Sequence, residues 1–179
     1  MSDPKKWQRR HRLALYLYLA LVAGHFSEHL LQLVQVYWLG WSPRLAGGLL
    51  GLYFPSLAAS EVLHMTYNSL QLTGLIILLP GFKGLARRLW LIALVFQSWH
   101  FIEHAFLQIQ YLTGHYFLGA IKQMSFLEIF FPRLELHFVY NLLVFVPTIL
   151  ASLIYLKNFA AFSPDLIPSP RSAASTNIN

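Results

Sequence analysis

Hydrophobic residues fall in four long stretches along the chain, at about residues 13–39, 57–79, 89–112 and 134–156. Each stretch is near or above the ~20 residues that a helix needs to cross about 30 Å of hydrocarbon. A helix in the core of a soluble protein would be shorter and clearly amphipathic. The pattern therefore predicts an all-α, multi-pass integral membrane protein, in which the four stretches form a four-helix bundle.

Polar residues interrupt these stretches in an order that is repeated. The first and third stretches each contain the motif H-x-x-E-H. The second and fourth each contain L-H-x-x-Y-N, and F-P-x-L precedes it in both cases. The H-x-x-E-H copies occupy residues 25–29 and 100–104, the F-P-x-L copies 54–57 and 131–134, and the L-H-x-x-Y-N copies 63–68 and 136–141.

The order of these motifs predicts two tandem transmembrane hairpins, residues 13–80 and 87–157, within a transmembrane domain of residues 13–160. Both hairpins would start on the same side of the membrane. Repeats of that kind are related by a pseudo-two-fold axis along the membrane normal. The segment 161–179 is rich in proline, serine and alanine, and we expect it to be a disordered tail.

The charges predict how the helices are oriented. Ten of the 13 lysines and arginines precede the first stretch, lie between the second and third, or follow the fourth. The positive-inside rule then places both termini, including the basic segment 1–12, in the cytoplasm and the protein in the cell membrane. Only 11% of the residues are charged and 56% are hydrophobic, against about 25% charged in soluble domains. The expected partner is thus the lipid bilayer and not a nucleic acid; the oligomeric state is not predicted.

The repeated polar residues are of the kinds that bind metal ions. Histidine and glutamate at positions i, i+3 and i+4 share one face of a helix. Ionisable side chains within a bilayer are costly and normally face the interior of a bundle. We therefore expect them to converge on one metal site, with these ligands: His25, Glu28, His29, His64, His100, Glu103, His104 and His137.

Two of these ligands and four further residues receive additional roles. Glu28 and Glu103, one in each H-x-x-E-H copy, are the predicted catalytic residues, because they could bridge two ions or orient other ligands. Four further residues are expected to contact the ligands without binding the metal themselves: Asn68, Asn141, Glu61 and Glu135.

The chain contains no cysteine, which excludes thiolate ligation and leaves nitrogen and oxygen donors. The two-fold pattern favours two metal ions, and iron, zinc, copper and manganese all accept such ligands. Two alternatives stay open. The histidines could be axial ligands of haem or a related pigment, or they could form a hydrogen-bonded polar core without a metal.

The motifs resemble those of two groups of enzymes. H-x-x-E-H resembles the zinc-binding motif of the inverzincin peptidases, in which the glutamate is the general base. The pairs His25/His29 and His100/His104 resemble the histidine boxes of membrane di-iron oxygenases, although the chain has no H-x-x-H-H box and has additional glutamates. This resemblance implies oxidation, or secondarily hydrolysis, of a hydrophobic small molecule that reaches the site from the lipid.

Whether the protein is an enzyme is left open by the sequence. An oxidoreductase would depend on an electron-donor protein or a small donor, because the chain has no nucleotide or flavin motif. A non-enzymatic membrane subunit that binds haem, a pigment or a metal would carry the same histidines.

Overall fold

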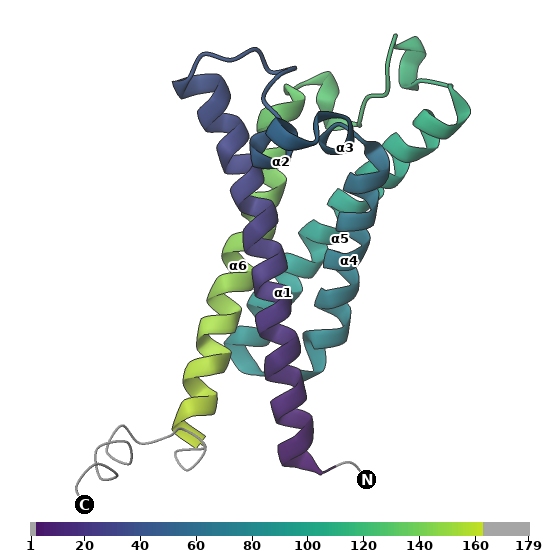
Figure 1. The fold of residues 1–179 in the computed structure, drawn as a ribbon. Coiled ribbons are helices and arrows are strands. Elements are labelled where there is room, and N and C mark those ends of the chain that lie inside the picture. Colours follow the sequence, from purple (N-terminus) through teal and green to yellow (C-terminus); the bar gives the residue numbers. More distant parts are fainter. Residues whose placement is uncertain (1–2, 163–179) are drawn as a thin grey trace, which may run out of the picture.

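The computed structural model describes residues 3–162, which form helices and loops without a strand. Four long helices make up most of this part of the chain (Figure 1). The first continues into a π-helical turn at Val34–Trp38. The long helices are α1 (Pro4–Leu33), α4 (Glu61–Leu78), α5 (Gly84–Thr113) and α6 (Arg133–Phe162).

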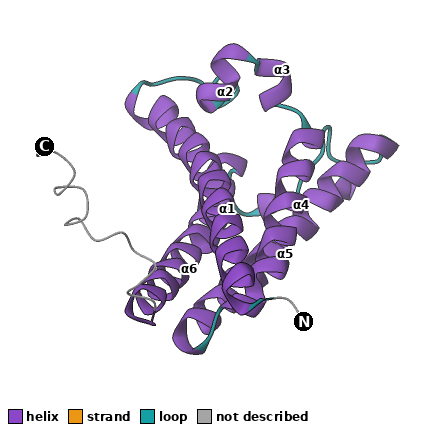
Figure 2. Cartoon of the chain, turned by 60° about the horizontal axis from the view of Figure 1, so that its bottom comes forward, coloured by secondary structure: helices purple, strands orange, loops and turns teal. Residues whose placement is uncertain are grey.

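The long helices pack in a ring, in which α1 and α5 each contact both α4 and α6. We call the end where α1 begins and α6 ends the terminal end, and the opposite end the loop end. A 3-10 turn at Leu79–Gly81 joins α4 to α5 at the terminal end. The short elements of the loop end are α2 (Gly48–Tyr53), α3 (Pro55–Ala58) and the 3-10 turns Phe117–Gly119 and Leu127–Ile129 (Figures 1 and 2).

Three of the four long helices are long and apolar enough to cross a membrane: α1, α4 and α6. The fourth, α5, has 30 residues, or about 45 Å of helix, but carries several buried polar side chains that lower its mean hydropathy. These are Gln97, His100, Glu103, His104 and Gln110. The prediction of an all-α four-helix bundle is thus confirmed, and three of its helices are candidate membrane spans. The fourth span, the internal repeat, its symmetry axis and the side of the membrane stay predictions.

The ends of the bundle differ from the predicted boundaries. Asp3 accepts a hydrogen bond from the backbone N–H of Lys5, at 3.0 Å, and so caps α1. Most of the predicted N-terminal segment 1–12 is therefore part of the first helix. At the other end, α6 includes residues 161 and 162 of the predicted tail, whereas residues 163–179 lie outside the described part of the chain.

The half of the bundle nearest the terminal end has an apolar core around Trp90, Leu15, Leu75 and Phe82. The indole N–H of Trp90 donates to the backbone oxygen of Leu75 at 2.8 Å. This core fixes the spacing of the helices and leaves the polar residues to the other half of the bundle.

His11, within the basic segment 1–12, is buried at the terminal end. Its Nδ1 lies 3.0 Å from the hydroxyl of Tyr155 and its Nε2 lies 2.9 Å from the backbone oxygen of Leu78. A buried histidine costs little when both ring nitrogens have partners. His11 therefore ties α1 to α4 and α6, and it is a structural residue.

Candidate metal centre

The structure brings the six predicted histidines together in the half of the bundle nearest the loop end. They come from all four long helices, so the cluster exists only when the bundle is assembled. Ring centroids lie 6.0 Å apart for His29 and His137, 5.6 Å for His64 and His104, and 5.7 Å for His100 and His137. His25 joins the cluster through His29, with ring centroids 4.5 Å apart. We call these six residues the histidine cluster.

Three members of the cluster form a tighter group. His100, His104 and His137 are all buried, and one ring nitrogen of each lies within 4.8 Å of the other two. The Nε2 atom of His104 is 3.1 Å from that of His100 and 3.2 Å from that of His137. Metal–imidazole bonds of about 2.0–2.1 Å place two ligand nitrogens roughly 2.9–3.4 Å apart in octahedral or tetrahedral coordination. The group therefore fits the ligand spacing of a single ion.

The hydrogen bonds of His137 determine which nitrogen can bind a metal. Its Nδ1 lies 2.9 Å from the backbone oxygen of Arg133. A carbonyl only accepts, so Nδ1 carries the hydrogen, and in the neutral ring Nε2 presents a lone pair. That lone pair faces His104, whose Nε2 also faces His100. A single hydrogen on His104 can satisfy one of these two contacts, whereas a cation would accept all three lone pairs.

His64 has the same arrangement on α4. Its Nδ1 lies 2.9 Å from the backbone oxygen of Ser60, so Nε2 carries the lone pair in the neutral ring. Metal-binding histidines in proteins commonly donate their other ring N–H to a carbonyl or a carboxylate, which fixes the tautomer and the ring orientation. On α1, the Nε2 atoms of His25 and His29 are 3.2 Å apart. The pair of His25 and His29 thus has a nitrogen spacing similar to those within the tight group.

Glu28 does not point into the histidine cluster. Its carboxylate accepts the backbone N–H of Leu50, at 3.1 Å from Oε2, and so caps the first turn of α2. Gly48 lies against this carboxylate with a φ of +69°, where a Cβ atom would collide with Oε2. Nearby Gln35 donates to the oxygen of Gly48 at 3.0 Å and accepts from its N–H at 2.9 Å. These contacts hold the loop-end segment over the site.

Glu103 occupies the corresponding place on α5. It is buried beside Ser125, the hydroxyl of Tyr140 and the backbone of Leu127. Gln110 holds the same segment, since it donates to the oxygen of Met124 at 2.9 Å. The structure therefore places the two predicted catalytic glutamates against the loops that cover the site. These positions do not support either glutamate as a metal ligand.

Glu61 is the carboxylate that the structure brings closest to the tight group. Its Oε2 lies 3.9 Å from Nδ1 of His104 and has no hydrogen-bond partner, and its Oε1 pairs with Arg133. Only 5% of Glu61 is exposed. Glu135, by contrast, accepts a hydrogen bond from the hydroxyl of Tyr37 at the end of α1. Of the two predicted supporting glutamates, Glu61 is thus the one beside a histidine.

The two predicted asparagines lie one turn away from the cluster. Asn68 donates to the backbone oxygen of His64 at 2.9 Å, and Asn141 donates to that of His137 at 2.8 Å. Gln97 from α5 donates to Oδ1 of Asn68 at 2.9 Å. Both asparagines therefore stabilise the helical turns that carry a histidine, and neither forms a hydrogen bond with an imidazole nitrogen of the described residues.

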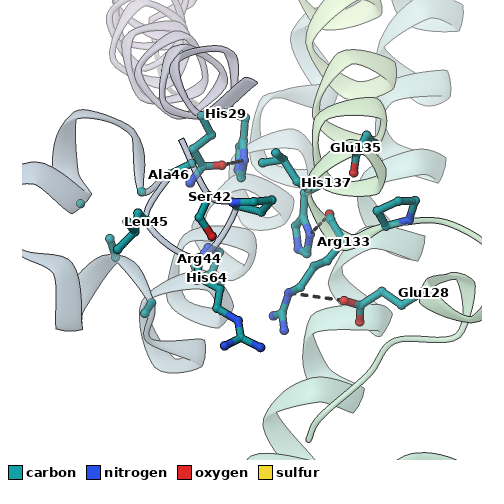
Figure 3. Close-up of a pocket in the computed structure, with 18 of the residues that line it drawn as sticks. His29, Ser42, Arg44, Leu45, Ala46, His64, Glu128, Arg133, Glu135 and His137 are labelled. Atoms are coloured by element: carbon teal, nitrogen blue, oxygen red, sulfur yellow. Dashed lines mark hydrogen bonds and ion pairs between the residues drawn. The ribbon is translucent and has the colours of Figure 1, made fainter. Parts of the chain in front are cut away.

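A cavity of about 890 Å³ opens beside the cluster at the loop end (Figure 3). His29, His64 and His137 line it, whereas His100 and His104 do not. Arg133 lies on the same cavity, and its Nε is 3.7 Å from Glu128. A small molecule in this cavity would reach the cluster from the side of these three histidines.

Arg133 and two tyrosines that contact the cluster had no role predicted from the sequence. Tyr67 stacks on His25 at 3.9 Å between centroids, and Tyr140 stacks on His100 at 5.0 Å. Both tyrosines belong to the L-H-x-x-Y-N motif, so their recurrence was a signal that could have identified them. Arg133 had no such signal, because the corresponding residue of the first F-P-x-L motif is Ser56.

The chain matches no protein-family model, no curated protein and no solved structure. The geometry of the histidine cluster is therefore the basis for inferring its function.

Proposed function

We propose that the protein is a membrane metalloprotein whose histidine cluster binds one or two transition-metal ions. The observation that carries this proposal is the group of His100, His104 and His137, whose nitrogens are spaced like ligands of one ion. The lone pair of His137 points at the same place as the two imidazoles of α5. The histidines that would hold this first ion are thus His100, His104 and His137.

A second ion would be held by the histidines of the first hairpin. His25 and His29 have Nε2 atoms 3.2 Å apart, and His64 is oriented by its own backbone contact as His137 is. Ring centroids of His64 and His137 lie 6.2 Å apart, so the two groups adjoin. This supports the dinuclear site that the duplicated motifs predict.

We propose further that the site oxidises, or alternatively hydrolyses, a lipid-soluble substrate. A bound redox metal would supply electron transfer and oxygen chemistry, and a bound zinc would supply a Lewis acid. The residues of this chain would exclude bulk water and present the cavity beside His29, His64 and His137. Glu61 replaces Glu28 and Glu103 as the carboxylate proposed to act at the site, because its Oε2 lies 3.9 Å from Nδ1 of His104.

A non-enzymatic role is the second candidate. The observation that favours it is the placement of Glu28 and Glu103 against the loops. Among the described residues, Glu61 is then the single carboxylate that forms an ion pair, within 4 Å, with a histidine of the tight group. A metal-binding or haem-binding membrane subunit would need no general base beside its ligands.

Metal analysis of the purified protein, combined with an absorption spectrum, tests the proposal. We expect one or two ions per chain, and a loss of at least one ion in His104→Ala, whose Nε2 contacts two other ligands. His115→Ala is the matched control, because His115 lies in an exposed loop. A Soret band would instead identify haem. Native protein that binds no metal after purification and after titration with iron, zinc, copper and manganese would contradict the proposal.

A further inference from the structure

We propose that the ligand of this site is a single-chain amphiphile with an anionic head group, a fatty carboxylate or an alkyl phosphate monoester. Its head would lie in the cavity beside His29, His64 and His137, and its chain in a groove between α5 and α6. This inference rests on the proposed function, because it names the substrate class of the same site.

The groove has a volume of about 490 Å³ and lies between α5 and α6. Aliphatic and aromatic side chains line it, among them Val95 and Trp99 of α5 and Val139 and Leu143 of α6. These four side chains are between 37% and 68% exposed, so the groove faces the surroundings of the bundle. Ligand pockets commonly have volumes of about 300–1,000 Å³, and an apolar groove on a membrane-facing surface suits an alkyl chain.

The groove joins the cavity that the histidines line. Phe131 and Glu135 are part of the wall of both. Glu135 is held at this junction by the hydroxyl of Tyr37. An elongated molecule can therefore extend from the apolar groove into the polar cavity without leaving the protein surface.

The formal charges that line the cavity balance, and the cations without an ion pair are the groups that would bind an anionic head group. Three cations line it, Arg44, Lys122 and Arg133, together with the carboxylates of Glu61, Glu128 and Glu135. Two of the carboxylates pair with Arg133, and the third accepts the hydroxyl of Tyr37. Within residues 3–162, Arg44 and Lys122 form no ion pair, so the cavity presents two cations that a carboxylate or phosphate would neutralise.

The groove also lies close to the histidine cluster. The indole N–H of Trp99 donates to the hydroxyl of Tyr140 at 2.9 Å, and both residues line the groove. The ring of Tyr140 stacks on His100 at 5.0 Å between centroids. One aromatic ring therefore separates an alkyl chain in the groove from a histidine of the tight group.

Head-group contacts should decide which lipids bind. Lipid tails are as apolar as the side chains of the groove, so exchanging one tail for another changes the free energy little. Hydrogen bonds to charged groups contribute about 1.5–3 kcal/mol, which corresponds to a preference of at least about tenfold for the anion. A neutral alcohol of the same chain length is thus the appropriate comparison.

Photo-crosslinking of the full chain in detergent, with all metal removed, tests the inference. The probe is a 16-carbon carboxylate with a diazirine in the middle of its chain, and adducts are mapped by mass spectrometry. We expect adducts on α5 and α6 at the groove. The unlabelled carboxylate or the 16-carbon phosphate monoester should compete at least tenfold better than the 16-carbon alcohol, and the stronger of the two identifies the head group.

Matched variants separate specific binding from general contact with a hydrophobic surface. Replacing both Arg44 and Lys122 by glutamine should reduce labelling about tenfold, whereas replacing Arg87 and Arg88, exposed cations at the terminal end, should not. Leu143→Trp should fill the groove and abolish the adducts. Ile92→Trp, on an exposed part of α5 outside the groove, should leave them unchanged.

Three results would overturn the inference: equal competition by the alcohol, native labelling of the variant without Arg44 and Lys122, or adducts spread evenly over the apolar surfaces of all long helices. These readouts need no metal. A protein that binds the anion but no metal would retain the amphiphile site and lose the metal proposal. A protein that binds metal without preferring the anion to the alcohol would retain the metal proposal and lose the amphiphile site.

Discussion

At the scale of single residues, the site depends on how each imidazole is oriented. His64 and His137 each direct Nδ1 to a backbone oxygen of their own helix, at 2.9 Å in both cases. This contact lies one turn back along the helix and fixes the lone pair on Nε2 without any other residue. Glu61, from another helix, places its Oε2 3.9 Å from Nδ1 of His104, and we expect the affinity for metal to depend on that carboxylate.

Glu61→Gln should lower the affinity of the site about 10–100-fold while keeping the same number of bound ions, as is typical when a residue behind a metal ligand is changed. The change removes the negative charge that faces Nδ1 of His104 and the partner of Arg133. Competitive titration against a chelator measures the effect. Glu128→Gln is the control, because it removes the other partner of Arg133 but forms no ion pair with a histidine of the described residues. Equal losses in both variants would contradict the role of Glu61.

At the scale of elements, the loop-end segments are held over the site by two pairs of polar residues. Glu28 and Gln35 of the first helix and its π-helical extension hold α2. Glu103 and Gln110 of α5 hold the segment around Met124 and Leu127. The glutamate of each H-x-x-E-H motif thus has a structural position that the helical spacing alone did not predict.

Gly48→Ala should destabilise the α2 segment by about 1–3 kcal/mol, because the residue has a positive φ and its Cβ would collide with Glu28. Faster limited proteolysis between residues 40 and 54 would show the effect. Gly24→Ala is the matched control, since its Cβ would meet nothing within 4 Å and alanine favours a helix by about 1 kcal/mol. Equal protease resistance of the two variants would argue against this account of α2.

The buried pair of Gln97 and Asn68 connects α5 to α4 one turn from the cluster. Gln97→Leu would leave the buried Oδ1 of Asn68 without its donor, and an unsatisfied buried group costs about 1–3 kcal/mol. We expect a lower temperature of thermal unfolding in detergent, with metal binding retained. Gln108→Leu, on the same helix, should have a smaller effect, because Oε1 of Gln108 has no hydrogen-bond partner among the described residues. The reverse order would contradict the role of the pair of Gln97 and Asn68.

At the scale of the whole molecule, the four long helices form a ring with an apolar core at the terminal end and the histidine cluster towards the loop end. The predicted topology places the terminal end in the cytoplasm, because ten of the 13 lysines and arginines belong to that side. The histidine cavity would then lie in the outer half of the membrane.

The chain has no cysteine, so single cysteines can report this topology. Lys6→Cys and Lys157→Cys should react with an impermeant maleimide only after the membrane is opened, whereas His115→Cys should react in intact cells. Both Lys157 and His115 are exposed, so their reactivity depends on the side of the membrane. Reaction of Lys6→Cys or Lys157→Cys in intact cells would contradict the predicted orientation.

The sequence by itself determined the helical bundle, its candidate membrane spans and the set of histidines. Long apolar stretches leave few alternatives to spanning helices, and the i, i+4 spacing of His25/His29 and His100/His104 already places each pair on one helix face. That is why the three apolar spans and the shared position of the histidines could be foreseen from local periodicity.

Only the tertiary structure decided which polar residues meet. Glu28 and Glu103 share a helix face with histidines, but their carboxylates reach loop backbone that helical periodicity does not describe. Arg133, Glu61 and His104 come from three different helices and contact each other only after packing. Spacing along a chain specifies the face of one helix, whereas contacts between helices depend on how all four pack, and this packing is what makes Glu61 rather than Glu28 the carboxylate beside the histidine cluster.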